Sequence, residues 1–333
     1  MGRLVKRLVK HYKITFFFLF LGAVSWSYYP REFVYTGSTM GTQFTIKAYK
    51  RFYVPKRRII DDVNRTLIRL SAQFSTYSDA SQISEFNQQS VLLELSNDWR
   101  ALLSLSQKLH DASSGAWDPT VWPLTKLWNL NRQDVFVPPS DAVIQDQLAI
   151  TGFDKITFDG KVLSKKNAKT QLDLSSIAKG YAVDRLSDAL LDMGITQFYV
   201  EIGGEIRVGK PLQGQPFWRL GIQDPQNTTS GAIVEVVELS TMSLATSGTY
   251  RQFRTWKGQA FSHILDPRTG YPIDNNVISV SVIHPSCAVA DGLATALMVL
   301  NASERQSLMT AFPKARIILF ESGPNGLQKI KLP

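Results

Sequence analysis

The sequence predicts an α+β fold of mixed, largely antiparallel sheets packed with helices. Helical and strand patterns alternate irregularly along the 333 residues, and after residue 195 strand follows strand through short connections. A βαβ barrel would need regular alternation, and the chain shows no internal repeat. It also lacks the GxGxxG fingerprint and the GxxxxGK[ST] loop of two common nucleotide-binding folds.

The composition fits one folded catalytic unit of two packed lobes. Hydrophobic residues make up 44% and charged residues 20%, and the net charge is +9. Much of the excess lies in two clusters, at Arg3–Lys13 and Lys50–Arg58, without a nucleic-acid motif. We interpret the first cluster as a topology signal and the second as a solvated loop that could face an anionic membrane surface. We therefore expect no nucleic-acid partner.

Metal thiolates and internal disulfides are excluded because Cys287 is the only cysteine. The four histidines form no zinc pattern. Residues 1–30 join a basic stretch to the apolar run Ile14–Trp26, which predicts a signal or membrane anchor. The positive-inside rule then puts the domain at 31–333 outside the cytoplasm, with no cysteine near residue 25 for a lipid anchor. A buried helix at this position is the alternative.

The first half of the domain shows two helical patterns. Alternation after Met40-Gly41-Thr42 predicts a strand, and apolar spacing predicts helices at Ile59–Phe74 and Asp98–His110. Residues 75–88 are polar and predict a loop that carries Tyr77. Next, Gly115 ends a helix, and the tryptophans of 113–130 form either core or a stacking pocket for a flat ring system. Residues 131–140 predict a linker or surface excursion.

The middle of the chain contains a candidate anion site. We expect short strands at Phe153–Leu163 and Thr170–Leu174, then a helix from Ser175-Ser176 to Gly194. A strand that leads into a helix start is such a site, with Lys179 in the first turn. The alternative is a plain helix capped by serine.

The second half predicts mainly strands. These lie at 197–211 around a Gly-Gly turn, at 218–225, at 232–240, at Ile278–Ile283 and at Ala315–Phe320. Between them, residues 243–253 predict a hydroxyl-rich loop that could cradle phosphate through Thr246, Ser247 and Gly248. A strand end is predicted at Ser262–Leu265, before a turn at 266–268, and His263 on that strand is either structural or functional.

An apolar helix is predicted at Ala288–Leu300. Asp291 and Thr295 are four residues apart, so they lie on one helical face. A buried carboxylate must be capped, paired or bound to a cation. Two interpretations therefore stand: Asp291 caps the helix while Thr295 bonds to the main chain, or both bind a hard cation such as Mg²⁺.

Eight motifs in order resemble the FAD:protein FMN transferase family, also called the ApbE family. They are MGTQF, FSTYSDASQISEFN, GAWDPTVWPLTKLW, DLSSIAKGYAVDRL, VEIGGEIRVGK, ATSGTYRQF, HILDPRTGYP and ADGLATALMVL, within residues 35–320. The resemblance implies two interlocked lobes with the FAD site between them. It also implies Mg²⁺-dependent cleavage of FAD and transfer of FMN to a threonine or serine of an acceptor flavoprotein, with release of AMP.

The resemblance assigns roles to particular residues. His263 matches a catalytic histidine, and Asp291, Thr295 and the carbonyl of Ser176 match metal ligands. Contacts to FAD are implied for Met40, Tyr77, Ala116, Trp117, Asp118, Asp173, Lys179, Thr246, Ser247, Gly248 and Ile264.

The family implies a location as well. We expect the protein at the periplasmic side of the bacterial inner membrane, attached by its N-terminal segment or released after cleavage. Two other functions stay open: a Mg²⁺-dependent FAD pyrophosphatase that yields FMN and AMP, and a non-catalytic periplasmic FAD-binding protein.

Overall fold

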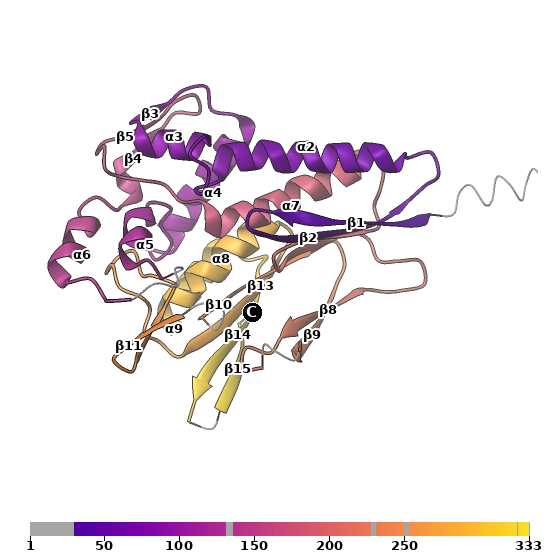
Figure 1. Cartoon of the computed structure of the whole chain (residues 1–333). Helices are drawn as coiled ribbons and strands as arrows, with labels where there is room; N and C mark the ends of the chain where they lie inside the picture. The colour runs from indigo at the N-terminus through magenta and orange to yellow at the C-terminus, as the bar shows by residue number, and fades with distance from the viewer. Residues whose placement is uncertain (1–29, 131–135, 228–230, 250–252, 325, 333) are drawn as a thin grey trace, which may run out of the picture.

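An eight-stranded antiparallel sheet forms the centre of the computed structural model (Figure 1). The model describes residues 30–130, 136–227, 231–249, 253–324 and 326–332. In spatial order, the strands are β1 (Arg31–Thr39), β2 (Thr42–Lys50), β6 (Phe198–Ile202), β7 (Glu205–Val208), β10 (Ser243–Gly248), β13 (Val277–His284), β14 (Arg316–Gly323) and β15 (Gly326–Leu332). This sheet and its helices confirm the predicted α+β class.

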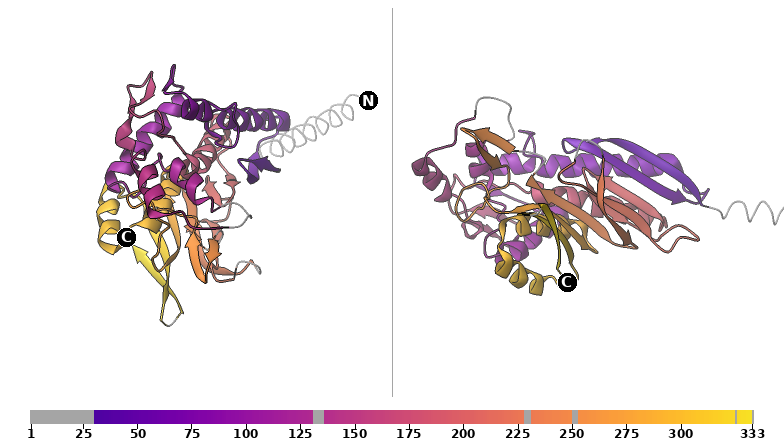
Figure 2. Two further views of the ribbon diagram at one scale, coloured as in Figure 1. Left: turned by 60° about the vertical axis from the view of Figure 1, so that its left-hand side comes forward. Right: turned by 90° about the horizontal axis from the view of Figure 1, so that it is seen from below.

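Helices cover one face of the sheet in two layers. α7 (Ser175–Asp192) and α8 (Cys287–Val299) pack side by side on the strands, and α2 (Lys56–Phe74) packs on α7 (Figures 1 and 2). The other described helices are α3 (Gln82–Gln88), α4 (Asn97–Ala112), α5 (Trp122–Trp128), α6 (Asp141–Leu148) and α9 (Ala302–Ala311).

A hairpin packs on the opposite face. It consists of β8 (Trp218–Gln223) and β9 (Ile233–Leu239), which form a small core with Ile283 and Phe320. The neighbouring residues Val282 and Leu319 point the other way, into the main core under the helices. Successive residues of a strand point to opposite faces, so β13 and β14 are buried on both sides.

Two small sheets complete the fold. The first has three strands, in the order β3 (Val91–Leu92), β5 (Leu163–Lys165) and β4 (Ile156–Phe158). The 3-10 helix η1 (Phe153–Lys155) directly precedes β4 in the chain. The second is the hairpin of β11 (Phe253–Trp256) and β12 (Gln259–Ser262).

Most of the strongly periodic elements are confirmed. The predicted helices appear as α2, α4, α7 and α8, and the strand–Gly-Gly–strand unit appears as β6 and β7. Gly115, at φ 78°, donates its N–H to the carbonyl of His110 and ends α4 as expected. Elements with weaker patterns were not predicted: β1, β3, α5, α6, β11, α9 and β15.

The loop predicted for residues 75–88 is wrong over its second half. Residues 82–88 form α3, because Ser81 caps the helix by accepting from the N–H of Ser84, and Ile83 and Phe86 are fully buried. The local polar composition hides two apolar side chains at helical spacing.

The strand predicted for Thr170–Leu174 is also wrong. The side chain of Asn87 bonds both main-chain groups of Leu172, accepting from its N–H at 2.7 Å and donating to its carbonyl at 2.9 Å. The next N–H, of Asp173, donates to the carbonyl of Pro119. These partners replace a neighbouring strand, so the segment is held without a ladder.

The expected N-terminal signal or anchor lies outside the described residues, as does part of the expected linker at 131–140. Within the described ranges, no helix combines the length and the apolar character needed to cross a bilayer.

Candidate active site

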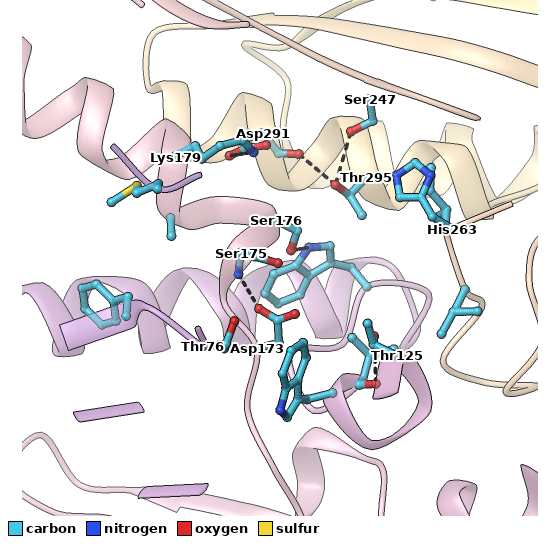
Figure 3. Close-up of a pocket in the computed structure, with 18 of the residues that line it drawn as sticks. Thr76, Thr125, Asp173, Ser175, Ser176, Lys179, Ser247, His263, Asp291 and Thr295 are labelled. Carbon is cyan, nitrogen blue, oxygen red and sulfur yellow. Dashed lines mark hydrogen bonds and ion pairs between the residues drawn. The ribbon is translucent and has the colours of Figure 1, made fainter. Parts of the chain in front are cut away.

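A cavity of about 470 Å³ lies between the sheet with α7 and α8 on one side and the α2 and α5 ends on the other. This volume is in the range of small-molecule and cofactor sites. All fifteen residues that the sequence analysis singled out line it: Met40, Tyr77, Ala116, Trp117, Asp118, Asp173, Ser176, Lys179, Thr246, Ser247, Gly248, His263, Ile264, Asp291 and Thr295. Figure 3 shows ten of the lining residues with labels, from several elements.

Helix α8 presents Asp291 and Thr295 to the cavity, one turn apart (Figure 3). The capping interpretation of Asp291 is wrong, because α8 begins at Cys287 and the side chain of Ser286 caps it by accepting from the N–H of Val289. The other half of that interpretation is confirmed, since the hydroxyl of Thr295 donates to the carbonyl of Asp291 at 3.3 Å.

A second carboxylate holds the start of α8. Asp184 of α7 is buried and accepts from the N–H groups of Cys287 and Ala288 and from the hydroxyl of Ser286. Arg207 of β7 donates to the same carboxylate at 3.0 Å. This network fixes α8 against α7, and therefore fixes the position of Asp291.

The carboxylate of Asp291 contacts the first turns of α7. Its Oδ2 accepts from the N–H of Gly180 at 3.0 Å and lies 3.9 Å from the Nζ of Lys179. Asp291 is only 3% exposed, and burial raises its pKa to about 7, against the opposing effect of Lys179. The site therefore contains a carboxylate that is costly to keep charged without cations.

Lys179 is the cation that faces this carboxylate, and Glu205 is its second partner. The Nζ of Lys179 lies 3.3 Å from Oε1 of Glu205, which is 4% exposed. Burial lowers the pKa of Lys179, but Asp291 and Glu205 raise it more strongly, so the ammonium stays charged. The pKa shifts of Lys179 and Asp291 describe one interaction. Lys179 stays protonated, so a change in the protonation of this pair occurs at Asp291.

Glu205 was not predicted as a site residue. It opens β7 after the Gly-Gly turn, 26 residues from Lys179, and only the packing of α7 on β7 joins them. β7 reads EIRV and places Glu205 and Arg207 on one face, so the signal in the sequence was a pair of charged residues that need partners when buried.

The α7 N-terminus meets the aromatic wall of the cavity. The indole N–H of Trp117 donates to the hydroxyl of Ser176 at 3.0 Å. The N-cap of α7 is Leu174, which makes no side-chain cap, so the serine-cap interpretation is wrong. The carboxylate of Asp173, one residue earlier, accepts from the N–H of Ser175 at 2.8 Å. Burial raises the pKa of Asp173, against the hydrogen bonds from Ser175.

Asp118 lines the cavity, but both of its carboxylate oxygens accept hydrogen bonds that stabilise the fold. One accepts from the N–H and hydroxyl of Thr120, and the other accepts from the N–H of Phe153 at 2.9 Å. The ring of His110 lies 3.4 Å from the second oxygen. These bonds shape the turn that carries Ala116 and Trp117 into the cavity.

The loop conformation predicted for residues 243–253 is wrong over residues 243–248, which form the strand β10. The residues Thr246, Ser247 and Gly248 pair with β13 opposite Ser281, Val280 and Ser279. All three residues still line the cavity, and the hydroxyl of Ser247 lies 3.3 Å from that of Thr295. Residues 250–252 of this segment lie outside the described part of the chain.

His263 follows β12 directly and lies beside Thr295 in the cavity (Figure 3). The N–H of the next residue, Ile264, donates to the hydroxyl of Ser262 at 3.1 Å, which fixes the turn. On the other side of the cavity, Tyr77 is 83% exposed and forms its rim.

The acidic residues do not form a conventional metal cluster. Among the described residues, no three or more histidine, cysteine, aspartate or glutamate side chains gather as a metal site. A cation at Asp291 would therefore take mixed oxygen ligands, from carboxylate, hydroxyl and main-chain carbonyl, which suit Mg²⁺ rather than zinc.

Known proteins are similar to this chain in sequence and fold. The model of the ApbE family matches residues 40–319. The FAD:protein FMN transferase of Vibrio cholerae is 37% identical over 304 residues, which cover 88% of this chain and 90% of that protein. The protein of the same description from Salmonella typhimurium is 30% identical, over 88% of this chain and 86% of that protein.

Solved structures agree. The flavin transferase ApbE from Vibrio cholerae superposes with a TM-score of 0.80 at 33% identity, over 91% of this chain and 97% of that one. The flavinyl transferase ApbE of Pseudomonas stutzeri, in its apo form, gives 0.80 at 34% identity, over 91% and 95%. In fold and site, the protein is an enzyme of the flavin-transferase class. The chain belongs to the ApbE family.

Proposed function

We propose that the protein uses Mg²⁺ to split FAD and attach FMN, through a phosphoester, to a threonine or serine of an exported or membrane acceptor flavoprotein. One observation carries the proposal: Asp291 and Thr295 of α8 line one cavity with His263, which follows β12, and with Lys179 and the start of α7. Transfer of FMN from FAD to protein is also the activity named for the relatives.

The donor set fits a hard divalent cation. The carboxylate of Asp291 and the hydroxyl of Thr295 are one helical turn apart. Asp291 accepts from the N–H of Gly180, and in a regular helix that N–H faces the carbonyl of Ser176. The Asp291 carboxylate therefore lies at the same turn as the Ser176 carbonyl. These three oxygens would hold Mg²⁺, with phosphate oxygens and water completing its ligands.

The charges of the site explain why a cation is required. Lys179 faces two buried carboxylates, Asp291 and Glu205, so the group carries a net negative charge when Asp291 is ionised. Such a site repels a pyrophosphate. Bound Mg²⁺ would reverse this sign and neutralise charge on the phosphate oxygens. It would also lower the cost of keeping Asp291 ionised.

The chain supplies a proton acceptor and ring contacts. In the transfer, the acceptor hydroxyl oxygen forms a bond to the FMN phosphorus, the bridging P–O bond breaks and AMP leaves. We assign His263 as the base that receives the hydroxyl proton, since its reference pKa near 6.5 suits this role. Trp117 and Trp122 line the cavity and offer faces to the flat rings of FAD.

One assay separates the three candidate functions. The protein is incubated with FAD, Mg²⁺ and an acceptor flavoprotein domain, and the acceptor is weighed by intact mass spectrometry. A mass gain of one FMN supports the transferase. Free FMN with an unlabelled acceptor supports the pyrophosphatase, and unchanged FAD supports the non-catalytic binding protein. Either of the last two results overturns the proposal.

The location stays part of the proposal. The basic and apolar N-terminal sequence supports export to the periplasmic side of the inner membrane, by an anchor or a cleaved signal. Fractionation of cells that express the full chain, with protease accessibility from the periplasmic side, tests it. Protection from protease in intact spheroplasts would contradict it.

A further inference from the structure

The end of the molecule where β1 begins carries two exposed aromatic residues in a fixed loop. Phe52 and Tyr53 lie between β2 and α2 and are each 58% exposed, with ring centroids 5.7 Å apart. The loop is held from below, because Val54 is buried and its carbonyl accepts from the Nζ of Lys50 at 2.7 Å. The fold therefore presents both rings to the exterior.

The same end is strongly basic. Exposed cations surround the two rings at Arg31, Arg51, Lys56, Arg57 and Arg58. Two acids lie among them: Asp61, 3.7 Å from Arg57, and Glu32, which accepts from the hydroxyl of Tyr49. We call Arg31, residues 51–53 and residues 56–58 the basic-aromatic end.

The position of these cations is unfavourable for the helix itself. Lys56, Arg57 and Arg58 occupy the first turn of α2, which contains no acidic residue, and the N-cap Pro55 makes no side-chain cap. The positive end of the helix dipole repels cations there. Burial and the charges of Lys56 and Arg31 also lower the pKa of Lys50, as expected where positive charges are crowded. An external anionic surface would relieve this repulsion.

The path of the chain brings this end close to any membrane that the N-terminal segment enters. Arg31 pairs with Lys50 in the β1–β2 register, so the start of the domain lies beside the basic-aromatic end (Figure 1). In sequence, the apolar run Ile14–Trp26 stops five residues before Arg31. Five extended residues span at most about 17 Å.

We propose that the basic-aromatic end is a contact surface for an anionic lipid bilayer. Phe52 and Tyr53 enter the interfacial layer, where amphipathic and aromatic side chains are stable, and the cations bind lipid phosphates. This contact is separate from the N-terminal segment and does not depend on the proposed chemistry.

The contact would also fix the distance between the bilayer and the cavity. α2 begins at the basic-aromatic end with Lys56 and reaches the cavity with Phe74. Its 19 residues correspond to about 27 Å at 1.5 Å per residue. A chain bound through this end keeps the cavity away from the lipid and open to the aqueous side.

The test uses the full chain with a single label. Cys287 is the only cysteine and is buried, so Tyr53→Cys creates one reactive site for an environment-sensitive dye. The labelled full chain is reconstituted into vesicles of pure phosphatidylcholine or of phosphatidylcholine with phosphatidylglycerol. We expect a blue shift of the dye emission only with phosphatidylglycerol. A dye at Leu93→Cys, 64% exposed and near β3 at the far end, should report water in both.

Charge reversal provides the second arm. Arg57→Glu with Arg58→Glu should lower the ratio of lipid-inserted to free dye by at least about 30-fold, since the loss of two cations alone accounts for that factor. The matched pair Lys161→Glu with Lys169→Glu, two exposed lysines elsewhere, should leave it unchanged. The proposal is overturned if the dye at residue 53 reports water in both kinds of vesicle. It is also overturned if the blue shift is the same with and without phosphatidylglycerol, or if charge reversal at residues 57 and 58 leaves the shift unchanged.

Discussion

The N–H of Gly180 in α7 donates a hydrogen bond of 3.0 Å to Oδ2 of Asp291 in α8, across 111 residues of sequence. The two helices can approach this closely because residue 180 has no side chain. A Cβ at Gly180 would lie 2.5 Å from the carbonyl oxygen of Cys287. The contact joins the two segments that the proposed function assigns to the metal.

Gly180→Ala should therefore separate α7 from α8. The added methyl group meets the backbone of Cys287, which cannot move without shifting α8. We expect a loss of about 1–3 kcal/mol in the free energy of unfolding and a weaker apparent affinity for Mg²⁺ in the transfer assay. As a control, Gly292→Ala meets mainly the side-chain end of Leu109, so its effect on Mg²⁺ should be smaller. Equal Mg²⁺ dependence in wild type and Gly180→Ala would contradict the argument.

Asp291→Asn tests the metal assignment with little change of shape. The amide oxygen can still accept from Gly180, while the charge that attracts a cation is lost. Apparent Mg²⁺ affinity should fall by at least about 10–100-fold, the loss seen for weaker, outer-shell changes. Thermal unfolding serves as the fold control. Unchanged Mg²⁺ titration curves in a folded variant would refute the role of Asp291.

His263→Ala should separate binding from chemistry. Removal of a general base lowers the rate by about 10²–10⁴-fold, while the rest of the cavity still binds FAD. Single-turnover transfer measures the rate, and quenching of flavin fluorescence measures binding. Tyr77→Ala, at the exposed rim, provides a contrast in which binding changes more than rate. Transfer by His263→Ala at the wild-type rate would remove it as the base.

Lys179→Met should destabilise the fold through the carboxylates it leaves behind. Asp291 and Glu205 are both under 5% exposed and would lie in the core without this cation. Loss of one partner of a buried pair costs about 3–5 kcal/mol. Lys179→Met combined with Glu205→Gln should recover part of that loss, which urea unfolding of the single and double variants measures. Strictly additive losses would mean that Lys179 and Glu205 are not coupled.

The pair of His110 and Asp118 predicts a pH dependence of stability. The hydrogen bond to Asp118 raises the pKa of His110 above 6.5, although burial opposes it. The pair therefore stabilises the folded state fully below about pH 6.5, and this stabilisation disappears as the pH rises through the folded-state pKa. The stability difference between wild type and His110→Gln, from urea unfolding, should be larger at about pH 5.5 than at about pH 8. A difference that grows with pH would have the wrong sign.

Local patterns were sufficient for several parts of the molecule. Apolar residues at helical spacing predicted α2, α4 and α8, because one buried stripe is specified by neighbours within two turns. The four-residue spacing of Asp291 and Thr295 put both on one side of α8, and the motifs matched a family that the comparisons confirm.

Other features required the tertiary structure. Residues 243–248 contain three hydroxyl side chains and a glycine, a composition suited to a loop, yet they form β10 because β13 supplies hydrogen-bond partners more than 30 residues away. In the reverse direction, residues 170–174 lose their predicted strand because Asn87 takes the bonds of Leu172. The hydrogen-bond partner of a backbone group therefore cannot be predicted from the residues next to it in the sequence.

Motifs and periodicity were enough to identify the family, the strongly periodic helices and the residue types of the site. Packing was needed to show that Asp291 caps nothing in its own helix, that Glu205 faces Lys179 and that Asp184 accepts hydrogen bonds from the start of α8. The physical reason is that hydrophobic period is a short-range property of the chain. The pairing of buried charges instead depends on which helices and strands pack together, over separations of 26 to more than 100 residues.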